Sequence, residues 1–144
     1  MWREETVMSI KLGIYKCSVC GNVVQVLLEG DGELVCCGHE MDFLEANYEE
    51  NEIGEKHVPD IAIVHEGCES GVCSEVKYVS VKKHPMEKEH YIQFIEVYSK
   101  DKTELRLKFF KPDEMAQYDI TGFDDNAVAL ELCNIHSLWR NKND

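Results

Sequence analysis

The chain has 144 residues, of which 44% are hydrophobic, and its formal net charge is −13. This length accommodates one ordinary domain of about 100 residues plus a small appendage, and the composition is typical of a globular protein. The acidic balance excludes a nucleic-acid surface, because contacts with phosphates need clustered Lys and Arg.

The first residues show no export or membrane signal. Glu4, Glu5 and Lys11 interrupt the apolar residues, so a signal-peptide core is absent. No stretch approaches the roughly 20 apolar residues of a membrane span. Met8 is an alternative start residue to Met1. We expect a cytoplasmic protein without a membrane partner, in which the seven cysteines serve as metal ligands because the cytosol keeps thiols reduced.

Residues 9–44 are expected to form a small first domain that is rich in Gly and Cys. Residues 23–29 predict a strand, and Gly30-Asp31-Gly32 predicts a turn that returns the chain to Leu34 and Val35 as a hairpin. A segment this small usually needs a metal or disulfides to fold. The hairpin would bring together the two ends of the segment, where its cysteines lie.

Those cysteines have the spacing of a metal site. Cys17 and Cys20 are separated by two residues, and the adjacent pair Cys36 and Cys37 follows after fifteen more. Four thiolates complete a tetrahedral site for zinc or iron, whereas calcium and magnesium prefer oxygen ligands. Disulfides or buried free thiols are the alternative.

At this point the chain resembles a known family. The run KCSVCGNVVQVLLEGDGELVCCGHEM is similar to a desulforedoxin domain, whose pattern is CxxC, a hairpin and then CC. The resemblance implies an iron ion bound by the four cysteines and a homodimer. His39 and Glu40 stand where that family commonly has Gln-Pro, and we expect His39 to be exposed rather than a ligand. Zinc would fit the same four ligands without redox chemistry.

The second domain is expected over residues 55–144, after an acidic, polar linker at residues 45–54. Leu105, Leu107 and Phe109 alternate with charged residues, which predicts a strand with one buried face. Further strands are predicted near residues 76–81, 91–98 and 128–132, and residues 67–71 predict a loop. The expected fold is mainly β, with an immunoglobulin-like antiparallel β-sandwich as the second domain.

Five more metal-ligand candidates occupy three short segments of this domain, which are residues 55–59, 84–92 and 133–136. They are His57, His84, His90, Cys133 and His136. Each histidine taken alone is ordinarily a surface or core residue. Cys133-x2-His136 has ligand spacing, however, and imidazoles with one thiolate suit iron, copper or zinc.

The three segments together resemble the catalytic domain of superoxide reductases, and with the first domain they resemble the two-iron desulfoferrodoxins. The resemblance implies a ferrous ion with four histidine nitrogens in its plane, Cys133 on its axis and an open sixth position. It implies one-electron reduction of superoxide to hydrogen peroxide, as a detoxification. It further implies two iron ions per chain and electrons from a reduced rubredoxin-like donor.

Glu55 and Lys56 match family residues beside the open position. Lys56 offers a local positive charge that attracts anionic superoxide to an acidic protein. Glu55 resembles the carboxylate that occupies the sixth position in the oxidised state. The alternative for both is a solvated surface pair.

Some residues depart from the family pattern or lie outside it. Asp60 stands where the family is usually apolar, Phe94 where Trp is common, and Ser137 replaces the glycine usual after the last ligand histidine; none removes a ligand. Cys68 and Cys73 belong to neither group, and we favour inert loop thiols over a reversible disulfide. A third metal site at the nearby histidine, His65, has weak support.

Two other functions use the same residues. Superoxide dismutation would evolve oxygen as well as peroxide, and a zinc-containing binding module would be colourless and redox-silent.

Overall fold

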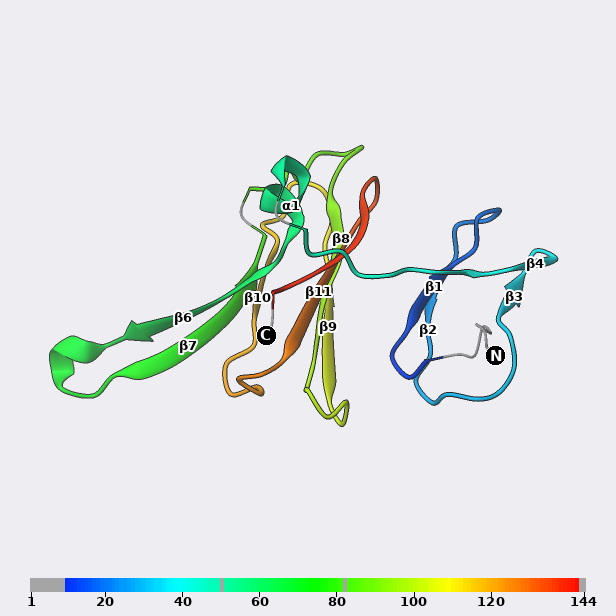
Figure 1. Cartoon of the computed structure of the whole chain (residues 1–144). Helices are drawn as coiled ribbons and strands as arrows, with labels where there is room; N and C mark the ends of the chain where they lie inside the picture. The colour runs from blue at the N-terminus through cyan, green and yellow to red at the C-terminus, as the bar shows by residue number, and fades with distance from the viewer. Residues whose placement is uncertain (1–9, 50, 82, 143–144) are drawn as a thin grey trace. The chain divides into compact units, whose positions relative to one another are not determined.

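The computed structural model describes residues 10–49, 51–81 and 83–142, and the alternative start residue Met8 lies outside them. The chain divides into two compact units, Met1–Glu45 and Ala46–Asp144. Every pairing between named strands is antiparallel, and α1 is the only α-helix among the described residues (Figure 1). The prediction of a mainly β fold is confirmed. Within the described ranges, no helix has the length and apolarity needed to cross a membrane.

The first unit contains five short strands. They are β1 (Ile14–Lys16), β2 (Val23–Gln25), β3 (Val35–Cys36), β4 (His39–Glu40) and β5 (Asp42–Phe43). One sheet has the order β2-β1-β5, and β3 pairs with β4. Its small core consists of Tyr15, Cys17, Val26 and Met41. Because so few apolar side chains are buried, a metal or another crosslink is the expected source of further stability.

The hairpin predicted between residues 23–29 and 34–35 is wrong. β2 ends at Gln25 and pairs with β1, and β3 pairs with β4 instead. Gly21 has a φ of 83°, a left-handed conformation that glycine adopts without strain, and it closes the turn between β1 and β2. Leu27 and Leu28 are 62% and 84% exposed, so the apolar run continues past the strand without being buried.

The second unit is a β-sandwich of seven strands. The first sheet, in the order β10-β7-β6, contains β6 (Asp60–Glu66), β7 (Ser74–Ser80) and β10 (Gln117–Asp119). The second sheet, in the order β12-β11-β8-β9, contains β8 (Ile92–Tyr98), β9 (Leu105–Phe109), β11 (Val128–Cys133) and β12 (Ser137–Arg140). Three strands facing four is the arrangement of an immunoglobulin constant-type sandwich.

The core of this unit lies between the two sheets. Its most buried members include Val79, Ile95, Val97, Ile120 and Ala129. Cys133 belongs to the same cluster, at the end of β11. The last residue of a core strand is held rigidly, so this thiol has a well-defined position.

The strand predicted at residues 105–109 is confirmed, but the prediction that one of its faces is buried is wrong, because all five residues are exposed. β9 is an edge strand that pairs with β8 so that Arg106 and Lys108 lie opposite the core residues Val97 and Ile95. The two cations stack over the rings of Phe123 and Phe110, at 4.9 Å and 5.4 Å from the ring centroids. Alternate residues of a strand face opposite sides of the sheet, so Leu105, Leu107 and Phe109 face outward and are exposed.

The expected linker at residues 45–54 leads directly into the second unit. Asn47 forms a bridge with Trp139 in β12. The helix α1 (Glu52–His57) begins after Asn51, whose Oδ1 accepts a hydrogen bond of 2.7 Å from the Gly54 N–H. It ends before Val58-Pro59, because the residue before a proline avoids the helical conformation. This short helix places His57 at the edge of the sandwich.

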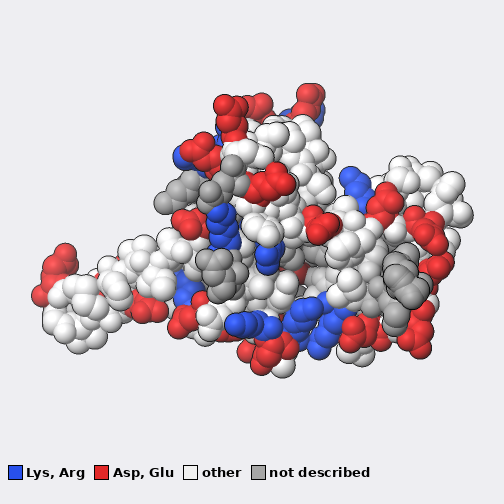
Figure 2. Space-filling model, in the orientation of Figure 1, with Lys and Arg blue, Asp and Glu red and all other residues white. Residues whose placement is uncertain are grey.

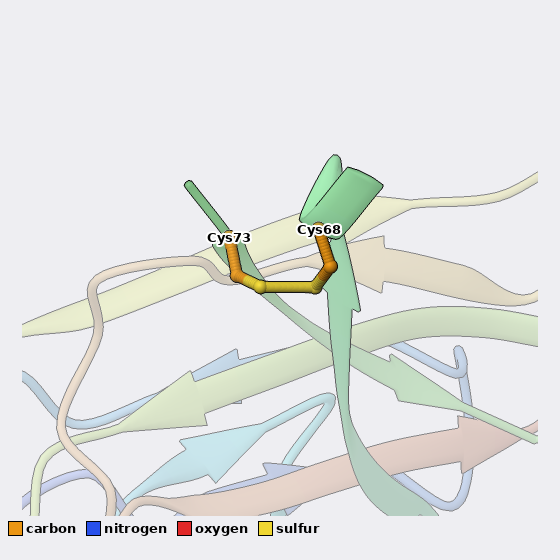
Figure 3. Close-up of a disulfide and its surroundings, with 2 residues drawn as sticks. All are labelled: Cys68 and Cys73. Carbon is orange, nitrogen blue, oxygen red and sulfur yellow. A yellow bond between two sulfur atoms is a disulfide. The ribbon is translucent and has the colours of Figure 1, made fainter. Parts of the chain in front are cut away.

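Cys68 and Cys73 are joined by a disulfide at the far end of the β6–β7 hairpin (Figure 3). The preferred interpretation of this pair as inert thiols is therefore wrong. The connection between the strands is a 3-10 turn, Cys68–Ser70, with Gly67 and Gly71 on either side in left-handed conformations.

Candidate metal centres

The four cysteines of the first unit meet at two tight turns. Cys17 and Cys20 lie in the turn between β1 and β2, Cys36 is the last residue of β3, and Cys37 follows it in the turn to β4. Their sulfur atoms are all within 4.8 Å of one another. Cys37 itself has a φ of 53°, so the adjacent pair is accommodated by a left-handed residue.

The spacing of these sulfurs fits a single ion. Cys36 Sγ lies 3.5 Å from Cys20 Sγ and 3.9 Å from Cys37 Sγ. Four thiolates at about 2.3 Å from a shared tetrahedral ion are about 3.8 Å apart. The Cys20 N–H donates to Cys17 Sγ over 3.5 Å, a bond that favours the thiolate.

Electrostatics in this group favour a bound cation. The Cys20 N–H lowers the pKa of Cys17 to about 6, whereas the neighbouring Cys20 thiol raises the pKa of Cys36 to about 12. The pKa of Cys37 is also raised, and the hydrogen bond with the Cys20 side chain is the largest cause. Clustered thiols oppose one another's ionisation, and a metal ion removes that opposition.

The second group lies at one end of the sandwich. The donor atoms of His57, His90, Cys133 and His136 are all within 4.8 Å of one another. His84 joins them, because its Nε2 is 3.1 Å from His57 Nε2 and 3.2 Å from Cys133 Sγ. The structure thus brings all five predicted residues of this group together from α1, the segment before β8, and the turn between β11 and β12.

Hydrogen bonds decide which nitrogen His57 and His84 direct at this group. His57 Nδ1 donates to the Ile53 carbonyl over 2.7 Å, and His84 Nδ1 donates to the Pro85 carbonyl over 2.6 Å. A carbonyl can only accept, so both protons are on Nδ1 and each Nε2 of the neutral ring carries a lone pair. Two lone pairs then face each other at 3.1 Å, which is repulsive unless a cation lies between them.

The unsatisfied atom of His90 points to the same conclusion. His90 Nε2 is buried and has no hydrogen-bond partner in the described part of the chain. Burying a polar atom without a partner is costly, and metal coordination removes that cost. Two nitrogen ligands at right angles, each about 2.1 Å from one ion, lie about 3.0 Å apart, which matches His57 and His84.

The four imidazole rings surround a common space. Around the perimeter, the centroid distances are 4.5 Å from His57 to His84, 4.6 Å from His84 to His90, 5.1 Å from His90 to His136, and 4.7 Å from His136 to His57. The diagonal from His57 to His90 is 6.3 Å. Four rings in a quadrilateral plus one sulfur make five donors, one more than a closed tetrahedral zinc site uses.

Burial keeps this group in the state that binds metals. It lowers the pKa of His84 to about 4 and also lowers the pKa of His57, so both rings are neutral at pH 7. Burial raises the pKa of Cys133, against the opposing N–H groups of His136 and Ile135. The His136 N–H donates to Cys133 Sγ over 3.4 Å. A cation beside the sulfur would further favour the thiolate.

Two residues that position the ligands were not singled out from the sequence. Asn134 accepts from the Tyr91 N–H over 2.9 Å and donates to the Glu89 carbonyl over 3.0 Å, so it connects the Cys133 and His90 segments. The Trp139 ring stacks on His57 at 5.0 Å and its Nε1 donates to the His136 carbonyl. In the sequence, only their closeness to Cys133 and His136 indicated that Asn134 and Trp139 could position the candidate ligands.

Glu55 and Lys56 lie outside the group of donor atoms. The Glu55 carboxylate accepts from Lys83 Nζ over 3.0 Å, and this pairing lowers the pKa of Glu55. The side chains of Glu55 and Lys83 are 66% and 65% exposed. Lys56 is exposed and lines a surface pocket of 210 Å³ with Glu55 and Lys83. Lys83 was not anticipated, although it precedes His84 in the sequence.

Two further histidines and Ser137 are not among the donor residues of either group. His39 is exposed on β4 and His65 on β6, and neither belongs to the two groups found among the described residues. Ser137 has a φ of 70°, a left-handed conformation that favours glycine. This conformation explains why a glycine at this position would be accommodated more easily.

Comparisons with known proteins agree with both units. Residues 9–44 match the family model for the desulfoferrodoxin N-terminal domain, and residues 49–142 match the desulfoferrodoxin model. The chain is 40% identical over 136 residues to a desulfoferrodoxin from Desulfarculus baarsii, which covers 94% of this chain and 100% of that protein. It is 64% identical over 28 residues to a desulforedoxin from Megalodesulfovibrio gigas, covering 19% of this chain and 76% of that one.

A solved structure supports the fold. The crystal structure of the superoxide reductase from Treponema pallidum superimposes with a TM-score of 0.59 at 19% identity, covering 92% of this chain and 98% of that one. At this level of identity the likeness concerns the fold alone. The two family models and the 40% identity over nearly the whole chain decide the family. This chain belongs to the desulfoferrodoxin family.

Proposed function

We propose that the protein is a superoxide reductase, which reduces superoxide by one electron to hydrogen peroxide at a ferrous ion. The ion would be held by His57, His84, His90, His136 and Cys133. The solved structure of similar fold is that of a superoxide reductase. We infer the same activity for this chain because its five donor residues fit such a metal site.

The arrangement of His57 and His84 carries this proposal. Each ring has its N–H bonded to a backbone carbonyl, so the two free lone pairs converge at 3.1 Å beside Cys133. A cation bound between the two nitrogens makes this arrangement favourable. Five donors leave one of six octahedral positions open, and an open position distinguishes a catalytic from a structural metal.

When bound, ferrous iron would supply the electron and a place for superoxide, and the Cys133 thiolate would donate electron density to it. The residues of the chain control the surroundings. The His57 ring stacks on Trp139 and donates a hydrogen bond to the Ile53 carbonyl, and these two contacts fix its plane. The His136 N–H draws electron density from the Cys133 sulfur, which moderates its donation.

The approach of the anion is assigned to the pocket beside α1. Lys56 and Lys83 line it, and they flank His57 and His84 in the sequence. Glu55 and Asp60 also line this pocket, and Glu55 is paired with Lys83. Lys56 would therefore supply the local positive charge that opposes the repulsion of superoxide by a protein of net charge −13. Lys56 would also hold a water that delivers one of the two protons needed to form hydrogen peroxide. Glu55 would leave Lys83 to occupy the open position in the oxidised state.

We propose further that the first unit binds a second iron ion through its four cysteines and relays electrons. Four thiolates leave no position for substrate, so electron transfer is the chemistry available there. A reduced rubredoxin-like protein would be the donor, in the cytoplasm. A homodimer is supported by the exposed apolar residues of this unit, Val19, Val23, Val24, Leu27, Leu28, Val35 and Phe43.

Metal analysis combined with product stoichiometry tests the activity. The expected result is two irons per chain, visible thiolate absorption that changes with oxidation, and one peroxide for each superoxide consumed, without oxygen. Oxygen evolution would show dismutation instead. A colourless, zinc-only protein would contradict both iron sites. Sedimentation of the loaded protein measures whether it is a dimer.

A further inference from the structure

The end of the β6–β7 hairpin carries a disulfide that the proposed function does not use. The two strands pair from Asp60↔Ser80 to Glu66↔Ser74, and Cys68 and Cys73 follow just outside the last pair. Their Cα atoms are 4.4 Å apart. The disulfide therefore closes the tip of the hairpin (Figure 3).

This tip is open to solvent. Cys68 and Cys73 are both exposed, and Val72 between them is 74% exposed. Ile63 and Val64 face opposite sides of β6 and are 51% and 43% exposed, so neither face of the outer hairpin is covered. The hairpin extends beyond the other strands of its unit (Figure 1). A thiolate from another molecule can thus approach either sulfur.

The fold does not depend on this crosslink. The hairpin is held by its ladder of paired residues and by Val79 in the core, and neither Cys68 nor Cys73 belongs to a core cluster. The disulfide joins residues only five apart, so it removes less chain entropy from the unfolded state than a disulfide that closes a long loop. Exposed disulfides that contribute little to the fold are typically the labile ones.

The other cysteines indicate the redox conditions under which this disulfide exists. Cys17, Cys20, Cys36, Cys37 and Cys133 form no disulfide in the structure. They can bind a metal only when reduced. Conditions that keep them reduced also supply thiols that attack an exposed disulfide, so Cys68 and Cys73 are expected to exchange with those thiols.

We propose that Cys68 and Cys73 form a thiol–disulfide exchange site whose partner is a dithiol reductant. One thiolate of the reductant attacks the Sγ of one cysteine, the S–S bond breaks, and the other sulfur leaves as a thiolate and takes a proton. The second thiol of the reductant then resolves the mixed disulfide. Two electrons pass to the pair, which becomes two thiols, and the reductant becomes a disulfide.

The return reaction needs an oxidant, for which hydrogen peroxide suffices. Two thiols and one peroxide give one disulfide and two waters, through a sulfenic acid on one sulfur. Only this return step draws on the proposed function, which supplies the peroxide; the exchange itself does not.

The charge around the tip bears on the partner. Glu66, Glu69 and Glu75 lie within two residues of the cysteines, and acidic side chains are visible at the end of the hairpin (Figure 2). Negative charge disfavours thiolates of Cys68 and Cys73, so the attacking thiolate comes from the reductant. A dithiol protein with a neutral or basic surface around its thiols fits this tip.

Alkylation followed by trypsin digestion tests the site in the full, metal-loaded chain. Cleavage after Lys56 and Lys77 releases a fragment that contains Cys68 and Cys73 and no other cysteine. We expect this fragment to bind no alkylating reagent at first, two equivalents after dithiothreitol under native conditions, and none again after hydrogen peroxide.

Either of two results overturns the proposal. If dithiothreitol acts only after denaturation, the disulfide is structural. If the fragment takes two equivalents before any reductant and still does so after peroxide, the pair does not form a disulfide. These readouts do not depend on superoxide activity, so they separate this proposal from the proposed function.

Two variants sharpen the test. Cys73→Ser leaves Cys68 without its disulfide partner. Incubation with glutathione disulfide is then expected to add one glutathione to the same fragment, and no addition would contradict the accessibility of the site.

The double variant Cys68→Ser/Cys73→Ser is expected to keep the iron content and superoxide activity of the parent, because neither residue belongs to the metal groups. Loss of both would contradict the independence of this site from the fold.

Discussion

Ser137 follows His136 with a φ of 70°, in a region that costs a residue with a side chain about 1 kcal/mol. Replacing it with glycine should therefore raise the free energy of unfolding, by up to about 1 kcal/mol. Denaturant titration of the metal-loaded protein measures this change. Ser74→Gly is the control, because Ser74 is exposed in β7 without a positive φ, and glycine there should lower stability. Equal losses in both variants would contradict the assigned strain.

Lys56 is the residue whose proposed attraction of superoxide depends on its charge. Lys56→Ala should slow the bimolecular reaction with superoxide, by up to about tenfold, and should flatten its dependence on ionic strength. Stopped-flow measurements at several salt concentrations test both effects. Lys88→Ala removes the same charge from an exposed position outside the pocket and is expected to change the rate little. An unchanged rate in Lys56→Ala would eliminate the attraction assigned to this residue.

At the scale of elements, the helix α1 depends on Gly54. A Cβ at this position would overlap the carbonyl oxygen of Glu49, so the helix would have to move. Gly54→Ala is expected to lower the free energy of unfolding by about 1 to 3 kcal/mol and to reduce the iron bound through His57. Metal analysis and denaturant titration measure the two effects.

Ile53→Ala is the matched control in the same helix. Ile53 is 47% exposed, and its carbonyl, which accepts from His57, stays in place. Its effect on stability should be within about 0.5 kcal/mol. If Gly54→Ala keeps full iron content and stability, the close contact does not constrain the helix.

The strands differ in how far they could be predicted. β8 and β11 carry apolar residues at most positions and were expected from the sequence. β1 has three residues and no distinctive pattern, so its pairing with β2 was missed. In β9 the alternation indicated a strand correctly, but an edge position allowed Leu107 to face solvent. Alternation reports two different faces; it does not report which of them another sheet covers.

At the scale of the whole molecule, the two compact units suggest separable roles for their metal groups. Cys20→Ser/Cys37→Ser should remove the metal of the first unit. Superoxide reduction with an artificial electron donor should then stay within about twofold of the parent, since the two groups lie in separate compact units and share no residue. Iron analysis and rapid kinetics on the same sample test this expectation.

The comparison variant is Cys133→Ser, which removes the only sulfur donor of the second group. Its superoxide reduction should fall by more than about 100-fold, while the visible absorption of the first centre remains. A large loss in Cys20→Ser/Cys37→Ser, with the second iron still bound, would show that the first centre is required for catalysis.

The sequence by itself determined the kinds of donor in each group, their order along the chain and the mainly β class, because these depend on side-chain chemistry and local pattern. Only the tertiary structure decided which nitrogen of His57 and His84 faces the group, that neither face of β9 is buried, and that Cys68 and Cys73 are joined. Each of these depends on a partner supplied by folding, such as the Ile53 and Pro85 carbonyls for the two rings. The spacing of the Cys and His residues indicates the candidate ligands, and the fold sets the geometry in which they meet.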